Sequence, residues 1–147
     1  MGKKKQRDPP PKFSTGGTWH THHVIFFDDL LNSPAYIALS AHAKETYTIL
    51  MQEYKGKYSG PTIICPYSTF KEKGMRPNTL SRALLQLECY GFIKIEHGGL
   101  EHQPNKYTFV DKWKDSYDPA KLDAFKEEFK ETLKRKELAK ELKKDVS

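Results

Sequence analysis

The 147-residue sequence predicts an α+β fold with three short helices, a brief strand and a β-hairpin, followed by a long charged helix. Two observations lead to this prediction. Apolar residues recur at helical spacing in two segments bounded by glycine or proline, and short β-branched or alternating runs lie between and after these segments. A chain of this length usually forms one hydrophobic core.

The first helices are expected between residues 32 and 56. Residues 32–34 indicate the start of a short helical turn that ends near Leu39, because proline is common at the first helical position. Ser40 is then the expected N-cap of a helix that ends at Gly56. The apolar positions of this helix are Ala43, Tyr47, Leu50, Met51 and Tyr54.

A β-branched run at 62–65 is too short for a helix and predicts a strand. Residues 66–73 suit two helical turns, which Gly74 ends. The next helix is expected to start with Pro77 as its first residue and to stop at Gly91. Its apolar stripe consists of Leu80, Ala83, Leu84 and Leu87.

The two helices on either side of the tight turn form a helix-turn-helix candidate, and runs at 92–96 and 106–110 predict a β-hairpin with a long tip. Short motifs lie at the junctions: Gly74-Met75 at the turn, Thr79 to Leu84 and Leu87-Glu88 in the second helix, Gly91-Phe92-Ile93 entering the hairpin and Asn105-Lys106-Tyr107 leaving it. With these motifs, the stretch from Ser40 to Trp113 resembles a winged-helix domain. The resemblance implies a winged helix-turn-helix, with a three-helix core and the hairpin as its wing.

A lead-in to this stretch carries a narrower resemblance. Its residues are Leu30 to Tyr36, Leu39-Ser40 and Ala43-Lys44. They are similar to winged-helix proteins of Gram-positive plasmids, phages and conjugative elements, including the N-terminal domains of plasmid replication initiators.

We divide the chain into three parts. Residues 1–17 are a basic tail whose prolines and glycines predict disorder, residues 18–116 a winged-helix domain with an N-terminal extension, and residues 117–147 a charged C-terminal helix.

In a winged helix, the second helix of the helix-turn-helix normally enters the major groove of DNA. The resemblance thus implies base contacts by Pro77, Asn78, Ser81 and Arg82. At 100° per residue, Asn78 and Arg82 lie opposite the apolar stripe and should face solvent. Asparagine pairs well with adenine and arginine with guanine. In the alternative interpretation, Asn78 and Ser81 only complete the helix start and Arg82 is a solvated charge.

Other basic residues are candidates for contacts to DNA phosphates. Arg76 occupies the N-cap position but has no acceptor for the exposed backbone donors, so a phosphate contact would give it a role. Lys71 and Lys73 precede it. The wing should give orientation more than affinity, unless its tip is only a flexible loop, and its candidates are His97, His102 and Lys106.

The formal net charge of +6 and the sequence pI near 9.2 suggest nucleic acid as a partner. In residues 1–12, five basic side chains against Asp8 leave +4, whereas residues 13–110 and 111–147 each carry +1. The tail, with Lys3, Lys4 and Lys5, would bind phosphates without reading sequence, although it could equally serve solubility.

Several classes of function find no support in the sequence. It contains no recognisable nucleophile and base motif and no glycine-rich phosphate loop, so neither an enzyme nor a cofactor is expected. His20, His22 and His23 lack complementary ligands and indicate a polar linker rather than a metal site. Cys65 and Cys89 have no metal-ligand spacing and should be reduced. Because no apolar run is long enough to span a bilayer and no signal peptide is evident, we expect a soluble, cytoplasmic protein without membrane contact.

The C-terminal helix should begin at Asp118-Pro119 and reach about Lys144. Leu122, Phe125, Phe129 and Leu133 form one stripe, whereas Leu138 and Leu142 lie on nearly the opposite face. This helix either packs back on the winged helix or meets a second protomer or protein partner. On the second helix of the helix-turn-helix, Leu85 and Cys89 should point outward with Asn78 and Arg82, and Tyr90 should lie between that face and the apolar stripe. The cover of this apolar patch could be the Val24 to Phe27 segment, the stripe of the C-terminal helix, or a second protomer or protein partner; we expect a cover from within the chain.

Two functions follow. The first is sequence-specific binding of double-stranded DNA, as a regulator, a replication factor or a transfer-origin accessory protein of a mobile element. The second is a protein-interaction module in a replication or conjugation assembly, without sequence-specific DNA binding. We expect the first function and keep the second as the alternative, for which the near-neutral charge of residues 13–110 is the main observation.

Overall fold

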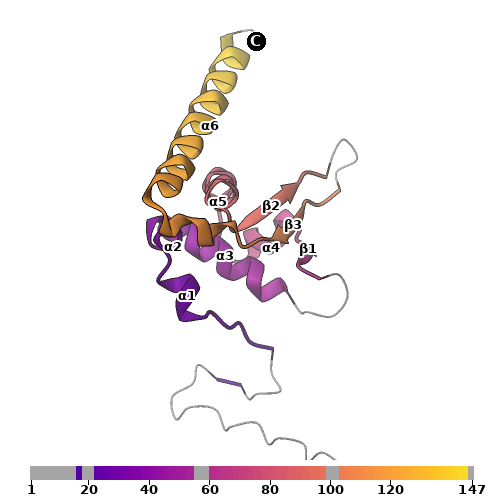
Figure 1. Ribbon diagram of the computed structural model, residues 1–147. Coiled ribbons are helices and arrows are strands. Elements are labelled where there is room, and N and C mark those ends of the chain that lie inside the picture. The colour runs from indigo at the N-terminus through magenta and orange to yellow at the C-terminus, as the bar shows by residue number, and fades with distance from the viewer. Residues whose placement is uncertain (1–15, 18–21, 55–59, 99–102, 146–147) are drawn as a thin grey trace, which may run out of the picture.

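The computed structural model describes residues 16–17, 22–54, 60–98 and 103–145 (Figure 1). It is an α+β structure in which helices pack against a small antiparallel sheet. The elements, in chain order, are α1 (Asp28–Leu31), α2 (Pro34–Ala38), α3 (Ala41–Glu53), β1 (Thr62–Ile64), α4 (Tyr67–Glu72), α5 (Pro77–Cys89), β2 (Ile93–Glu96), β3 (Lys106–Phe109), the 3-10 helix η2 (Lys112–Tyr117) and α6 (Pro119–Asp145).

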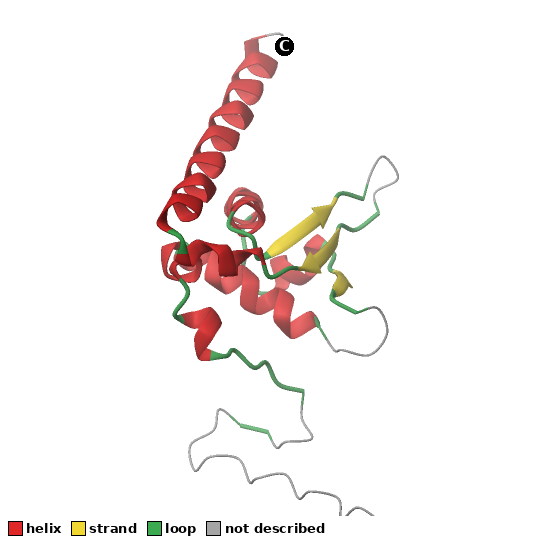
Figure 2. Cartoon of the chain, viewed as in Figure 1, coloured by secondary structure: helices red, strands yellow, loops and turns green. Residues whose placement is uncertain are grey.

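The sheet has the strand order β1-β3-β2, with antiparallel neighbours throughout, and lies to one side of the helices (Figure 2). The predicted hairpin is confirmed as β2 and β3, and the predicted first strand adds β1 to the other edge of β3. Tyr107 in the central strand pairs with Ile63 on one side and Ile95 on the other. Its buried ring meets the buried ring of Phe70 edge-on, with 6.2 Å between the centroids, so α4 is fixed to the inner face of the sheet.

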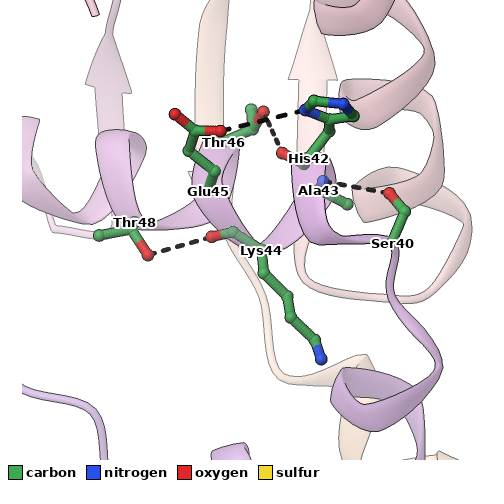
Figure 3. Close-up of polar contacts among 7 residues, drawn as sticks. All are labelled: Ser40, His42, Ala43, Lys44, Glu45, Thr46 and Thr48. Atoms are coloured by element: carbon green, nitrogen blue, oxygen red, sulfur yellow. Dashed lines mark hydrogen bonds and ion pairs between the residues drawn. The ribbon is translucent and has the colours of Figure 1, made fainter.

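Helix α3 packs against α5 and forms the centre of the core. The predicted N-cap is confirmed, because the Ala43 amide donates to the hydroxyl of Ser40 at 3.2 Å (Figure 3). The helix ends at Glu53 and not at Gly56 as expected, since Tyr54 is already extended. The Tyr54 ring lies edge-on to Phe109 of β3, with 5.7 Å between the centroids, so packing against the sheet coincides with the end of the helix.

The ring of Phe92 joins three parts of the core. It meets the ring of Tyr47 in α3 edge-on, with 5.4 Å between the centroids, and it stacks on the ring of Trp113 in η2, with 6.2 Å between the centroids. Gly91, just before it, has φ +84° and ends α5 as predicted. A Cβ at Gly91 would lie 2.7 Å from the backbone nitrogen of Trp113, so only glycine allows η2 to pack this closely.

Two elements were not predicted, α1 and η2. Helix η2 is bonded to both α2 and α1. The amide of Ala35 in α2 donates to the buried hydroxyl of Ser116 in η2 at 3.0 Å, and the hydroxyl of Tyr117 in η2 donates to the carbonyl of Asp29 in α1 at 3.1 Å. The start of α2 itself agrees with the prediction, with Ser33 as N-cap. The N-terminal extension is therefore held by a segment that follows the hairpin.

Helix α6 leaves the body of the structure as one long helix (Figure 1). Its predicted start is confirmed, since the Ala120 amide donates to the Asp118 carboxylate at 3.0 Å. Phe125 is buried in the core, and Phe129 meets Tyr90 of α5 edge-on at 6.0 Å. In the described part of the chain, neither α6 nor any other helix combines the length and the apolar character needed to cross a membrane.

The cover over the outward patch of α5 thus comes from within the chain, as expected, and it is the stripe of α6. Leu85, Cys89 and Tyr90 are each less than 10% exposed. These three side chains are therefore not open to a second protomer or a protein partner, so the structure does not support that alternative cover. The Val24 to Phe27 segment packs elsewhere: Phe26 lies 6.0 Å from the ring of Tyr47.

Candidate nucleic-acid interface

The predicted readout residues are exposed on the N-terminal half of one face of α5, whose C-terminal half, with Leu85 and Cys89, is covered by α6. Leu80, Ala83, Leu84 and Leu87 are buried, which turns Asn78, Ser81 and Arg82 toward solvent. Pro77 is the first residue of α5, as predicted, and is exposed. The helical spacing in the sequence was sufficient to place these side chains.

Arg76 lies at the N-cap of α5 in an extended conformation and its side chain makes no capping hydrogen bond, as its chemistry predicts. It lines a hollow with Thr79 and with residues of α3 and the turn: His42, Glu45, Gly74 and Met75. His42 and Glu45 are an exposed i,i+3 pair whose Nδ1 and Oε2 atoms lie 4.0 Å apart (Figure 3). No sequence pattern could have linked His42 and Glu45 to the turn before α5, because it is the packing of α3 on α5 that brings these segments together.

A second hollow, of about 450 Å³, lies between α5 and α6. Figure 1 shows α5 almost end-on and α6 lengthwise, so the axes of these two contacting helices are steeply inclined to each other. The α5 side is lined by Asn78, Ser81, Arg82 and Leu85, and the α6 side by Leu133, Lys136, Glu137 and Lys140. The predicted readout face is therefore one wall of a groove, and α6 supplies the other.

A third hollow continues from this groove toward the wing. Ser81, Leu85 and Lys136 line both, and the other residues of the third hollow are Tyr67, Leu84, Glu88, Ile95, His97 and Asn105. The exposed face of α5 is thus continuous with the base of the hairpin.

Hydrogen bonds hold the base of the hairpin. The Ile95 amide donates to the Glu88 carboxylate of α5 at 2.9 Å, and the Gly98 amide donates to the side-chain oxygen of Asn105 at 3.0 Å. His97 and Lys106 are exposed nearby, at the ends of the strands. The sequence motif around Asn105 therefore has a structural role at the hairpin base.

Three other basic candidates are exposed: Lys71, Lys73 and Lys106. They line none of the three hollows described above. His102 and the tail residues Lys3, Lys4 and Lys5 lie outside the described residues. The structure thus brings Asn78, Ser81 and Arg82 into one groove and places His97 beside it.

The lysines of α6 are the functional candidates that sequence reasoning missed. Lys136 follows Leu133 by three residues and Lys140 follows Lys136 by four, so both lysines continue the apolar stripe on the same helix face. In the part of the chain that the structure describes, no ion pair joins Arg82, Lys136 or Lys140 to a carboxylate. Extending the stripe beyond its last leucine would have found both lysines.

The groove lies next to the buried thiol of Cys89. Desolvation by burial, reinforced by the carboxylates of Glu128 and Glu88, raises the pKa of this thiol to about 11, while Lys136 lowers it slightly. The buried thiol is therefore neutral near pH 7, and its role is packing. Cys65 is likewise buried, and its pKa is raised to about 11, mainly by desolvation.

The histidine segment before α1 is described in part. The Nε2 atom of His22 lies 2.7 Å from the carbonyl oxygen of Gln52, which places this ring against α3. Across the described ranges, no three His, Cys, Asp or Glu side chains lie close enough to hold a metal ion. His20 lies outside these ranges.

Comparisons with protein-family models, curated proteins and solved structures found no match to this chain. The candidate interface is an exposed part of α5 with amide, hydroxyl and guanidinium groups, between a hairpin and a projecting helix.

Proposed function

We propose that this chain is a winged-helix protein that binds double-stranded DNA and prefers particular sequences. Helices α4 and α5 would form the helix-turn-helix, β2 and β3 the wing, and α5 the element that enters the major groove. The tight turn with Gly74 at φ +88° and the three-stranded sheet are compatible with this arrangement. The resemblance of the lead-in favours a regulator, a replication factor or a transfer-origin accessory protein of a mobile element.

The observation that carries the proposal is the shared exposed face of Asn78, Ser81 and Arg82. These side chains have no part in the core. Asparagine and arginine can each make two hydrogen bonds to a base edge in the major groove, where the four base pairs differ. A face used only for solubility would not need an amide and a guanidinium one turn apart.

The neighbouring cations would position the duplex and not select its sequence. Arg76 at the start of α5 and Lys71 and Lys73 before it are exposed and suited to phosphates. His97 and Lys106 would let the wing contact the backbone or the minor groove. These contacts should contribute equally to all sequences.

The test is a comparison of Arg82→Ala with the wild type, by fluorescence anisotropy on a duplex selected from a random library and on a random duplex. We expect a loss of roughly 1 to 3 kcal/mol on the selected duplex and relaxed discrimination at one position. Arg135→Ala is the matched control, because this arginine is exposed on α6 and its guanidinium donates to the hydroxyl of Thr132, one turn earlier in its own helix, at 3.4 Å. Unchanged affinity and selectivity of Arg82→Ala would refute the role of α5.

One observation favours the second candidate function, a protein-interaction module. Residues 13–110 carry a net charge of only +1, which is low for a domain that binds phosphates. Wild-type protein that shows no salt-dependent binding to any duplex would favour this candidate over DNA binding.

A further inference from the structure

The helix face of α6 that meets the domain changes its chemistry along its length. We call this face the seam: Leu122, Phe125, Phe129 and Leu133, then Lys136, Lys140 and Lys143, all spaced by three or four residues. The apolar part packs on the domain, and all seam residues after Leu133 are exposed. The seam becomes basic where it leaves the core and reaches the groove.

The net charge of α6 changes in the same way. Residues 119–133 contain three basic and four acidic side chains, whereas residues 134–145 contain six basic and three acidic ones. The docked half thus carries −1 and the projecting half +3. A helix that only needed solubility would not require this separation.

The projecting half shares a groove with the readout face of α5. Lys136 and Lys140 line one wall, and Asn78, Ser81 and Arg82 line the other. Glu137 is the single carboxylate among the groove residues, so their formal charge is +2. An anionic ligand in this groove would contact both helices.

We infer that the projecting half of α6 is a second DNA-binding element, in which Lys136 and Lys140 hold phosphates of the duplex that α5 reads. This inference rests on the proposed function. Lys136 to Lys143 spans about 10 Å along the helix axis, at ~1.5 Å per residue. This is close to the rise of roughly three phosphates of one DNA strand. The duplex backbone would lie along the open hollow of about 450 Å³ between α5 and α6.

A second copy of the chain fits the seam less well than DNA. Two identical seams would bring lysines against lysines, and like charges repel. The exposed leucines of this half, Leu138 and Leu142, lie on nearly the opposite face and are not part of the groove. Charge complementarity therefore favours a polyanion at the seam, and continuity with the α5 face makes that polyanion DNA.

The contribution of the seam lysines should differ from that of Arg82. A lysine at a phosphate adds affinity for every sequence and releases counterions, so it steepens the salt dependence of binding. Arg82 would instead distinguish one base pair from the others. The two kinds of residue share a groove and can be separated by measurement.

The experiment compares the double variant Lys136→Gln, Lys140→Gln with the wild type, by anisotropy on the selected and the random duplex from 50 to 300 mM salt. We expect the slope of log affinity against log salt to fall by roughly two, because each phosphate contact contributes about 0.9. Affinity should fall by the same factor for both duplexes. The matched control is Lys134→Gln, Arg135→Gln, which removes the same charge from the same half of α6 but off the seam, and it should keep the wild-type slope.

The outcomes separate this inference from the proposed function. Wild-type DNA binding with an unchanged slope in the seam variant overturns the inference and leaves the function of α5 standing. An equal fall in slope for the seam variant and its control also overturns it, because the effect would then be one of total charge. Wild type that binds a polyglutamate peptide but no duplex refutes both proposals. All four substituted side chains are exposed, and equal melting temperatures would verify that the variants are folded.

Discussion

The two halves of α6 belong to one continuous helix, but the docked half (119–133) packs against the core and the projecting half (134–145) is exposed. Phe125 in the first half is 6% exposed, whereas Leu142 in the second is 66% exposed. The intervening chain has no glycine or proline, and most of its residues favour helices, so the helix does not end where its packing ends. The difference shows that the seam, and not the helix, decides which apolar residues stabilise the fold.

The largest effect should come from the docked half. Phe125→Ala removes a buried ring that also lies 5.8 Å from the ammonium group of Lys112, and we expect a loss of roughly 3 kcal/mol in the free energy of unfolding. Urea unfolding followed by circular dichroism measures this loss. A change below about 0.5 kcal/mol would mean that α6 is not docked in solution.

The second-largest effect should be faster chemical labelling of Cys89, which α6 covers, when the docking of α6 is weakened. Burial raises the pKa of this thiol above its ordinary value of 9.0 to about 11, so docking favours the neutral form. The contribution of the neutral thiol to docking is present below pH 9 and is lost as the pH rises toward 11. In Phe129→Ala, which removes the ring against Tyr90, we expect labelling of Cys89 by a thiol reagent at pH 8 to accelerate about tenfold or more, because tenfold corresponds to roughly 1.4 kcal/mol of docking energy.

The control for this measurement is within the same chain. Cys65 is also buried, but it follows β1, and its amide donates to the carbonyl of Asn105 at 3.4 Å. The groups that act on its thiol are Glu53 of α3 and Thr69 of α4, whereas Cys89 has Glu128 and Lys136 of α6 beside it. Its labelling rate should stay at the wild-type value, as peptide mass spectrometry would show. Equal acceleration at both cysteines would indicate global unfolding and not release of α6.

The smallest effect is expected in the projecting half. Leu142→Ala removes an exposed side chain and should change the free energy of unfolding by less than about 0.5 kcal/mol. The same urea titration measures it beside Phe125→Ala. Destabilisation of 1 kcal/mol or more would show that Leu142 has a partner in solution and that the comparison between the halves is incomplete.

Sequence patterns predicted the elements whose signals are local. The stripe of α5, the alternation of the hairpin strands and the caps at Ser40 and Asp118 depend on residues a few positions apart. Helix η2 has no such signal, because it depends on the stacking of Trp113 on Phe92 and on the absence of a side chain at Gly91. Contacts between segments that are far apart in sequence leave no periodic pattern.

The candidate interface, like the fold, was predictable only where its signal is local in the sequence. The face of Asn78 and Arg82 followed from helical spacing, and the structure confirms its exposure. The second wall of the groove did not follow, because the sequence left three possible covers for Leu85 and its neighbours. Only the packed structure shows that α6 crosses α5 there and places Lys136 beside Ser81.

The hydrogen bond from Ala35 to Ser116 joins residues 81 positions apart. A ribosome delivers the chain from its N-terminus, so α2 leaves the exit tunnel long before η2 has been synthesised. Closing so long a loop also costs entropy before the contact forms. We therefore expect the N-terminal extension to be among the last parts to become ordered, after α3 and α5 have packed, even though it is the first to be made.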